Sequence, residues 1–288
     1  MLVTPAPGGG GSRRPPLVWG GPRPVFADID PVRLTLDPAA TDALVAPRTA
    51  AILPVHLYGR PADMAALTRI AERHGLAIIE DCCQAHLATC GGRPVGSFGS
   101  GAAFSFYPTK NLGGIGDGGA ACTNDAALAD RLRALRNGGQ SDKNLHAAAG
   151  VNSRLDELQA AVLRVRLRTL GDRTRRRRIL AESYRSRLGD APVTVPQECD
   201  RGSVHHLFPV LSPARDRLRT FLAAAGIDTM IHYPTAVAKQ PAFALYDPDP
   251  CPEAEAICGA VLSLPLHPGL TERDIAAVAD VVRTFAPA

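Results

Sequence analysis

Short apolar runs alternate with helix-like segments from Thr49 onwards. The run AAILPVHLYG, which ends at Gly59, has the length of a buried strand. In the next segment, PADMAALTRIAERHG, apolar residues recur at helical spacing, and Gly75 stands where a helix commonly ends. LAIIED and GAAFSFY then predict two further strands. This alternation predicts an α/β layer with a mostly parallel sheet.

Two more helices are predicted in the middle of the chain. After a strand in DGGAACTND, Asn124 would cap the first helix, over DAALADRLRALRNGG. Ser153 and Asp156 have the spacing of a capping box and would open the second helix. Its apolar stripe consists of Leu155, Leu158, Val162 and Val165. We expect this helix to continue past Gly171 towards Leu188, a length that would bridge two domains or carry a dimer contact.

The sequence pattern changes after Pro192 and predicts a smaller α/β unit. HHLFPVL and IDTMIHYP predict two strands around a helix in PARDRLRTFLAAAG, and a terminal helix opens at Thr271 and Glu272 after a loop in SLPLHPGL. The first residues include PAPGGGGSRRPP, whose glycines follow no strand and precede no GK[ST], which favours a flexible tail over a phosphate loop. We therefore expect a tail over residues 1–22, a large domain over 23–184 and a small domain over 185–288.

Composition and charge narrow the class of protein. The 288 residues are 45% hydrophobic and 21% charged, which is typical of a globular chain with one large domain or a large and a small one. Neither a signal peptide nor an apolar run of about 18 residues is evident, so we expect no membrane association. The basic run Arg173–Arg178 lacks interleaved aromatic residues. We interpret it as the solvated face of a helix and expect no nucleic-acid partner.

The seven cysteines are odd in number and irregular in spacing. Cys82, Cys83 and Cys90 flank His86, which invites a metal-site interpretation. Adjacent cysteines would, however, point to opposite sides of an extended backbone, and the two ligand pairs of a zinc site are missing. We therefore expect buried free thiols, no metal, and a reducing, cytoplasmic setting.

One acid and one lysine stand where two predicted strands end. Asp81 ends LAIIED, and Lys110 follows GAAFSFY by a few residues, so both would face the crevice beyond the carboxyl ends of a parallel sheet. Such a pair suits pyridoxal phosphate (PLP): the lysine joins the cofactor aldehyde as a Schiff base, and the acid keeps the pyridine nitrogen protonated. Desolvation would lower the lysine pKa, and Ser105 with nearby amides would hold the phosphate. A strand-end acid is also often a helix cap and a loop lysine is usually solvated, so spacing alone leaves both interpretations open.

The segments around this pair are more specific. VHLYGRPADM, IIEDCCQAH, FSFYPTKNLGGIGDGG, GVNSRLDELQAAVLRVRL, IHYP and SLPLHP occur in this order. Together they resemble the DegT/DnrJ/EryC1/StrS family of sugar aminotransferases, from about Arg23 to the C-terminus. The resemblance implies a fold-type I PLP enzyme with a smaller C-terminal α/β domain, usually a homodimer with active sites at the subunit interface.

The resemblance also implies roles for single residues. Lys110 matches the Schiff-base lysine, Asp81 the partner of the pyridinium, and Gln84 the side chain that contacts the ring face or its 3-hydroxyl. Ser105 matches a phosphate ligand, and Asn152 matches the residue that reaches the phosphate in the neighbouring subunit. From the residues alone, Gln84 could equally be a satisfied polar group and Asn152 a helix cap.

The implied substrate site and reaction follow from the same resemblance. His232 and Tyr233 of IHYP would line the substrate mouth, although core packing is an equal alternative. L-Glutamate would donate an amino group to a nucleotide-linked keto sugar, with Lys110 as general base and acid. PVHLYGRPADM is closest to members that act on a dTDP-linked 3-keto-6-deoxyhexose, and the composition fits amino-deoxysugar and antibiotic biosynthesis.

The sequence departs from the family pattern at its front. Family members carry an upstream phosphate loop at a helix N-terminus and an aromatic residue that stacks on the pyridine ring. Neither is expected between Met1 and Pro22, including at Trp19, so the resemblance implies a large domain that lacks its N-terminal part. Cys82 and Cys83 stand where alanines are common, and Leu87 where glycine is common. Two alternatives therefore remain: a truncated, non-catalytic structural or interaction partner, and a PLP-dependent sugar dehydratase, against which Lys110 argues because that branch tends to carry histidine there.

Overall fold

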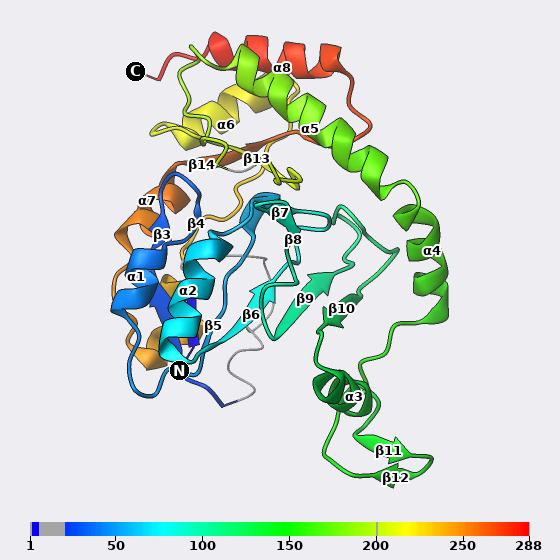
Figure 1. The fold of residues 1–288 in the computed structure, drawn as a ribbon. Helices are drawn as coiled ribbons and strands as arrows, with labels where there is room; N and C mark the ends of the chain where they lie inside the picture. The colour runs from blue at the N-terminus through cyan, green and yellow to red at the C-terminus, as the bar shows by residue number, and fades with distance from the viewer. Residues whose placement is uncertain (1, 6–20, 200, 288) are drawn as a thin grey trace.

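A six-stranded sheet forms the centre of the computed structural model, which describes residues 2–5, 21–199 and 201–287 (Figure 1). Its order is β10–β9–β6–β5–β1–β2, and every neighbouring pair is parallel except β9 with β10. The strands are β1 (Leu2–Pro5), β2 (Pro24–Ala27), β5 (Ala51–Ile52), β6 (Ala77–Asp81), β9 (Gly101–Ser105) and β10 (Gly119–Cys122). The mostly parallel α/β sheet expected from the sequence is confirmed.

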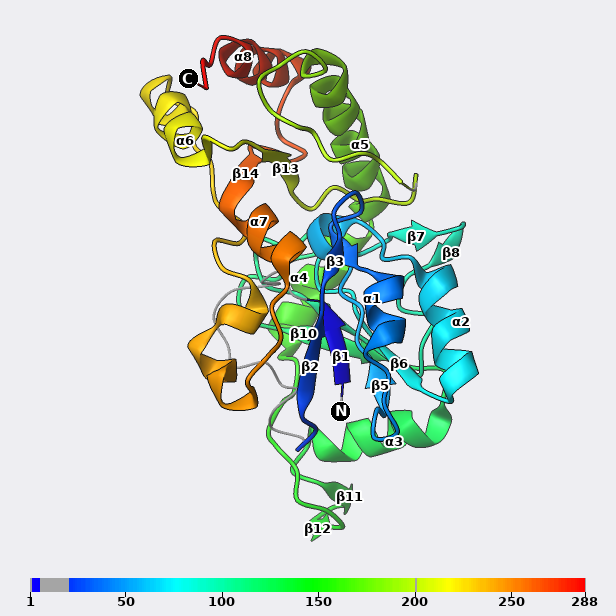
Figure 2. The same cartoon turned by 90° about the vertical axis from the view of Figure 1, so that its left-hand side faces the viewer.

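Helices cover both faces of this sheet (Figure 2). The helices α1 (Pro38–Ala43) and α2 (Met64–His74) lie on one face and α7 (Pro252–Ala260) on the other. Each face of the sheet has its own hydrophobic core, and successive side chains of β2 point into different ones. Phe26 packs in the core beneath α7, and Ala27 packs in the core beneath α2. As predicted, α2 ends at Gly75, which takes the left-handed conformation (φ 64°) that glycine favours.

The chain between the sheet and the C-terminal part forms an arm and two helices. The arm, residues 126–156, contains α3 (Ala126–Leu135) and the hairpin of β11 (Gln140–Asp142) and β12 (Leu145–His146). It is followed by α4 (Glu157–Leu167) and α5 (Leu170–Arg187). The single long helix predicted here is therefore wrong, since the chain leaves the helix at residues 168–169.

The two helix caps predicted for α3 and α4 also differ from the structure. Asp125, not Asn124, caps α3, and its Oδ1 accepts hydrogen bonds from the backbone of residues 127 and 128. Asp156 is itself the N-cap residue of α4 and makes no capping hydrogen bond, so the predicted box with Ser153 is wrong. The expected apolar stripe of α4 is largely uncovered in the single chain: Leu158 is 69% and Val165 is 64% exposed.

The C-terminal part packs around its own core. It consists of α5, α6 (Arg215–Ala224) and α8 (Glu272–Arg283) with an antiparallel pair, β13 (Phe208–Leu211) and β14 (Val261–Leu264). The strand predicted in IDTMIHYP is wrong, because that segment makes only an isolated bridge from Met230 to Ser263. The predicted start of α8 is confirmed: Thr271 forms a capping box with Asp274.

Short elements complete the fold and qualify the expected tail. Two hairpins connect larger elements: β3 (Ile29–Asp30) with β4 (Thr35–Leu36), and β7 (Thr89–Cys90) with β8 (Arg93–Pro94). Three 3-10 turns do the same: η1 (Leu57–Gly59), η2 (Val237–Lys239) and η3 (Pro241–Tyr246). Within the predicted tail of residues 1–22, β1 differs from expectation because it pairs with β2 and β5. Residues 1 and 6–20, including Trp19, lie outside the described residues. The domain limits at 23–184 and 185–288 stay a prediction.

Half of the arginine run is not a solvated face, which corrects the expectation from sequence. Arg177 is only 7% exposed and donates through Nη1 to three backbone oxygens, those of His205, His206 and Leu266. Arg176 and Arg178 donate to the backbone oxygens of residues 270 and 203. The run therefore ties α5 to neighbouring loops. Among the described helices, none has both the length and the apolar character to span a bilayer.

None of the seven cysteines forms a disulfide. Cys82, Cys251 and Cys258 are buried, as expected, whereas Cys122 and Cys199 are exposed. The expectation of buried thiols therefore holds for only part of the set.

Candidate active site

The carboxyl ends of β6 and β9 bring Asp81 and Lys110 to one edge of the sheet. The two strands are parallel neighbours with Asp81 opposite Ala103, and Lys110 lies in the loop that follows β9. Burial lowers the pKa of Lys110 from its ordinary value, while Cys83 and then Asp81 oppose this by favouring the charged amine. The acid and the lysine are thus close enough for their charges to interact, and the lysine deprotonates more readily than a solvated one.

The glycines after Lys110 allow the loop to fold tightly back on itself. An added Cβ at Gly113 would lie 2.5 Å from the backbone oxygen of Pro108, a distance that no side chain could occupy. Arg166 of α4 donates to the backbone oxygens of Gly113 (2.6 Å) and Gly114 (3.0 Å). The glycine-rich segment noticed in the sequence therefore serves close backbone packing that fixes the loop carrying the lysine.

Asp81 is oriented by its own strand end. Its Oδ1 accepts a hydrogen bond of 2.9 Å from the amide of Cys83. The Cys83 thiol also hydrogen-bonds the Asp81 carboxylate, and burial together with this carboxylate raises the pKa of the thiol. The carboxylate is therefore held in place at the end of β6.

Gln84 joins the sheet edge to the C-terminal part of the chain. Its Oε1 accepts a hydrogen bond from the Tyr58 amide (2.6 Å), and its Nε2 donates to the Tyr233 hydroxyl (2.9 Å). The Tyr58 hydroxyl in turn donates to the backbone oxygen of His232 (2.6 Å). Three residues that the sequence singled out, Gln84, His232 and Tyr233, are thus brought together. Tyr58, which links them, was missed, because its left-handed backbone (φ 61°) has no sequence signal beyond its place in VHLYG.

Histidines surround the lysine. His232 shares a hydrogen bond of 3.0 Å with the Ser263 hydroxyl, and burial and the charge of Lys110 lower its pKa. The ring of His86 contacts those of Phe104 and Phe106, and the same two causes lower its pKa to about 4. The charge of Lys110 also contributes to the low pKa of His206, a residue that sequence reasoning missed. These histidines are neutral at physiological pH and add no positive charge beside the lysine.

The remaining predicted residues differ in where they lie. Ser105 ends β9, and its hydroxyl accepts a hydrogen bond from the Tyr107 amide (3.2 Å) at the start of the lysine loop. Asn152 lies in the exposed arm, where its Oδ1 accepts a hydrogen bond from Arg154 Nε (3.2 Å). Within the described parts of the chain, no contact joins Asn152 to Lys110. The fold therefore gathers every predicted site residue except Asn152.

A buried group of His56, Glu80 and Cys82 has the composition of a metal site, but hydrogen bonds within the protein already engage His56 and Glu80. Their possible ligand atoms lie within 4.8 Å of one another. His56 Nδ1 accepts a hydrogen bond from the Ala62 amide (3.1 Å), so its Nε2 carries the proton and donates to Glu80 (3.2 Å). Glu80 also accepts from the amides of residues 96, 98 and 99. We assign this group a structural role in fixing that loop to β6.

The chain is similar to known proteins in both sequence and fold. The sequence profile of the DegT/DnrJ/EryC1/StrS aminotransferase family matches residues 14–283. The erythromycin biosynthesis sensory transduction protein EryC1 of Saccharopolyspora erythraea is 51% identical over 255 residues, which are 87% of this chain and 70% of that protein. The dTDP-3-amino-3,4,6-trideoxy-alpha-D-glucose transaminase of Streptomyces venezuelae is 50% identical over 273 residues, with 92% and 71% covered. The crystal structure of S. venezuelae DesV in complex with a ketimine intermediate has a TM-score of 0.90 and 46% identity, with 98% of this chain and 77% of that one covered.

Proposed function

The chain belongs to the DegT/DnrJ/EryC1/StrS aminotransferase family, and from this membership we propose that it transfers an amino group from L-glutamate to a dTDP-linked 3-keto-6-deoxyhexose. The resemblance inferred from the motifs is confirmed, and so is the fold of a PLP-dependent transferase. The chain is a PLP-dependent aminotransferase of the nucleotide-sugar class. The identity of the sugar and of the donor is the finer part of the proposal, supported by relatives named as dTDP-amino-sugar transaminases.

The observation that carries the proposal is the placement of Lys110 and Asp81 at one sheet edge, with the lysine partly desolvated. The residues fit PLP, which when bound supplies an electron-withdrawing ring that stabilises negative charge on the substrate carbon. The Asp81 carboxylate, oriented by the Cys83 amide, would hold the proton of the ring nitrogen. Gln84, buried between Tyr58 and Tyr233, would contact the ring, and Ser105 would bind the phosphate.

Lys110 has two tasks in this proposal. Its amine would hold the cofactor covalently and, when free, would take the proton from the substrate carbon and return it one position away. A solvated lysine, with a pKa near 10.4, is almost fully protonated at neutral pH and is a poor base. The lowered pKa of Lys110 makes the neutral amine more abundant in the pH range where the enzyme works.

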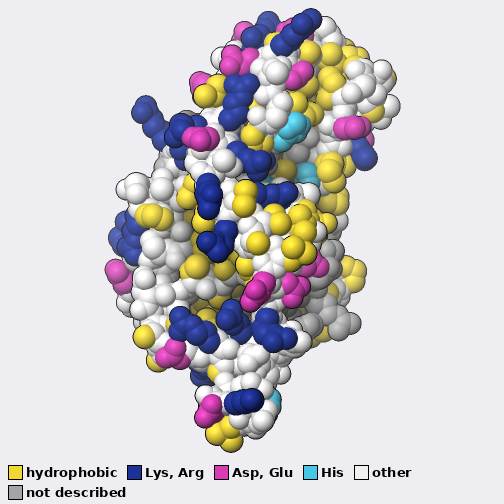
Figure 3. Space-filling view, turned by 90° about the vertical axis from the view of Figure 1, so that its right-hand side faces the viewer, with side chains coloured by type: hydrophobic (Ala, Val, Ile, Leu, Met, Phe, Trp, Pro, Cys, Tyr) yellow, Lys and Arg dark blue, Asp and Glu magenta, His cyan; other side chains and the backbone are white. Residues whose placement is uncertain are grey.

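We propose a homodimer in which the arm and α4 contact a second copy. The exposed apolar residues Leu158 and Val165 lie on this side, and Figure 3 shows hydrophobic side chains in the middle of the face with Lys and Arg side chains around them. A hollow of about 370 Å³ lies beside them, lined by Arg136, Arg154, Leu155, Asp156 and Glu157. Asn152, which does not reach the lysine of its own chain, would then reach the phosphate in the partner.

The proposed substrate mouth and setting follow from nearby features. His232 and Tyr233 stand beside Gln84, so the sugar would approach Lys110 from their side. None of the seven cysteines forms a disulfide, which supports the cytoplasmic setting that we propose. Relatives named for erythromycin biosynthesis and for amino-sugar transamination support a place in antibiotic deoxysugar biosynthesis.

The experiment mixes the purified chain with PLP, L-glutamate and dTDP-linked keto sugars. We expect a visible absorbance band, fixation of the cofactor to Lys110 by borohydride, and an amino sugar detected by mass spectrometry. A band without turnover of any sugar would favour the alternative of a non-catalytic partner protein. A product that has lost water without gaining nitrogen would favour the dehydratase alternative.

A further inference from the structure

The side chain after Lys110 is oriented unambiguously by its neighbours. Asn111 is buried, and its Nδ2 donates a hydrogen bond of 3.2 Å to the backbone oxygen of Val204. A backbone oxygen only accepts hydrogen bonds, so the amide nitrogen of Asn111 must face it. The Oδ1 atom consequently faces the other way, where it lies 3.1 Å from Nδ1 of His206.

This orientation sets the tautomer of His206. Because Asn111 Oδ1 only accepts, Nδ1 of His206 must carry the proton and donate it. Burial, with smaller contributions from the charges of Lys110 and Arg177, lowers the pKa of His206 well below the ordinary range. The ring is therefore neutral, with its single proton committed to Asn111.

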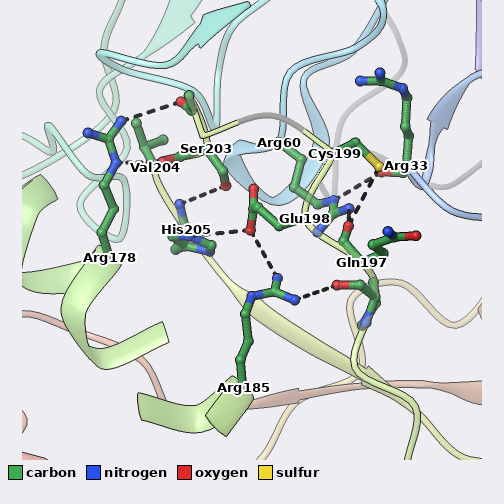
Figure 4. Close-up of polar contacts among 12 residues, drawn as sticks. Arg33, Arg60, Arg178, Arg185, Gln197, Glu198, Cys199, Ser203, Val204 and His205 are labelled. Carbon is green, nitrogen blue, oxygen red and sulfur yellow. Dashed lines mark hydrogen bonds and ion pairs between the residues drawn. The ribbon is translucent and has the colours of Figure 1, made fainter. Parts of the chain in front are cut away.

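Arginines fix the segment that carries His206. Arg177 of α5 donates to the backbone oxygens of His205 (3.1 Å) and His206 (3.2 Å). Figure 4 shows the flanking contacts: Arg178 donates to the Ser203 backbone oxygen (2.8 Å), and Glu198 lies between Arg185 (3.0 Å) and His205 (3.7 Å). Hydrogen bonds from charged donors to buried carbonyls are strong, so the position of His206 is set from α5 rather than from the lysine loop.

The segment of residues 204–206 also packs tightly against Gly59 of η1. Val204 donates its amide to the Gly59 backbone oxygen (2.9 Å). A Cβ added at Gly59 would lie 2.9 Å from the His206 amide nitrogen and 3.0 Å from the Gln84 backbone oxygen. Only a glycine fits at position 59, so residues 204–206 pack directly against the backbone there, and their hydrogen bonds to Asn111 start from a close-packed segment.

We propose that His206 is a positioning residue for Lys110: its hydrogen bond to Asn111 fixes the residue that follows the lysine and so holds the lysine amine at the edge of β6 and β9. The inference rests on the proposed function only in taking Lys110 as the cofactor-binding lysine. The link is indirect, because His206 acts through the neighbouring residue. Loss of the hydrogen bond would let the loop loosen and the amine reach water.

The lysine itself supplies a readout that needs no cofactor. Lys110, Lys143 and Lys239 are the only lysines in the sequence, so trace acetylation with quantitative mass spectrometry can follow each of them across pH. The last two are exposed and serve as internal standards. The titratable groups around the Lys110 amine are Asp81, Cys83, His86, His206 and His232.

Substitutions at position 206 distinguish the effect of the hydrogen bond to Asn111 from the effect of losing the imidazole ring. In His206→Leu, we expect the labelling midpoint of Lys110 to rise by about half a pH unit, a roughly threefold change in ionisation constant, as the amine regains hydration. His206→Asn keeps an N–H near the place of Nδ1 and should retain the native midpoint. His205→Asn is the matched control, because His205 contacts Glu198 and not Asn111, and asparagine tolerates its left-handed backbone (φ 43°). It should also retain the native midpoint.

Two results would overturn the proposal: a His206→Leu profile that overlays the native one, or a His206→Asn profile that shifts as far as that of His206→Leu. If circular dichroism shows that His206→Leu does not fold, Asn111→Ala tests the same bond from its other end, with the same expected shift and the same overturning result. The proposed function fails separately, if native Lys110 takes no PLP under borohydride while its labelling still depends on residue 206.

Discussion

The Tyr58 hydroxyl donates a hydrogen bond of 2.6 Å to the backbone oxygen of His232, 174 residues further along the chain. The amide of the same tyrosine donates to Gln84, whose side chain in turn donates to Tyr233. One residue of η1 therefore organises both the proposed ring contact and the proposed substrate mouth. Since the hydroxyl is buried, removing it would leave the oxygen of His232 without this donor.

Tyr58→Phe tests this relationship. We expect the free energy of unfolding to fall by about 1 kcal/mol, the usual net value of one hydrogen bond. We also expect KM for the sugar to rise severalfold with little change in cofactor binding, because His232 and Tyr233 lose a fixed position. Urea unfolding and steady-state kinetics measure the two effects. Tyr246→Phe, in η3 and outside the site, is the control; equal effects of both substitutions on KM would contradict the prediction.

Lys110→Ala should abolish the visible band with PLP and all fixation by borohydride. Its effect on turnover should be at least on the order of a thousandfold, because the cofactor link and the acid–base group are lost together. Lys143→Ala and Lys239→Ala remove exposed lysines from the arm and from η2, and both should keep the band. A band that survives in Lys110→Ala and disappears in either control would place the chemistry elsewhere.

The sequence predicts the positions of Asp81 and Lys110 well because these positions depend only on the order and direction of two strands. Asp81 and Lys110 follow strands that are parallel neighbours, and the ends of such strands meet at one edge whatever the details of packing. Tyr58 and His206 depend instead on contacts with residues far away along the chain, for which no local pattern exists. Asn152 was found by resemblance alone, and the single chain leaves it away from the lysine.

The errors in the fold have similar causes. The continuous helix predicted through Gly171 breaks at residues 168–169, although neither position carries proline or glycine, because local propensity is a weak guide to a bend. IDTMIHYP contains enough apolar residues to predict a strand, yet β14 pairs with β13 and Met230 makes only an isolated bridge to Ser263. Arg177 is read as solvated from composition, and only the packed structure supplies the three carbonyls that satisfy it.

Asp81→Asn should make Lys110 deprotonate at lower pH. The Asp81 carboxylate favours the charged lysine, so its removal lowers the lysine pKa further, and the labelling midpoint of Lys110 moves down by up to about one pH unit. Turnover should nevertheless fall about a hundredfold or more, because the ring nitrogen loses its partner. Trace acetylation and kinetics measure the two opposite changes. With Asp130→Asn on α3 as control, an upward shift of the Lys110 midpoint would refute the assignment.

His86 should make stability depend on pH in acid. Its pKa is about 4 in the folded chain, against an ordinary 6.5, so between these values the unfolded chain binds more protons. The free energy of unfolding therefore rises with pH through this window, and His86 contributes roughly 3 kcal/mol at pH 7 that is lost as the pH falls towards 4. Urea unfolding between pH 4 and 7 measures the slope. His86→Gln should make the slope shallower, with the other buried histidines, His206 and His232, supplying the rest. His267→Gln, at an exposed site, should leave the slope unchanged; equal slopes for His86→Gln and the native chain would refute this.

The proposed dimer predicts complementation between two inactive variants. Lys110→Ala removes the catalytic lysine, and Asn152→Ala removes a residue that would act in the partner's site. In a mixed dimer, one site would carry both defects and the other neither. If subunits exchange randomly, half of the dimers are mixed and half of their sites are intact, so mixing should restore roughly a quarter of the native activity.

Leu158→Glu with Val165→Glu, which changes residues exposed in the single chain, should give a folded monomer by sedimentation and abolish the rescue. No rescue in a mixture that sedimentation shows to be dimeric would mean that Asn152 does not serve the partner's site.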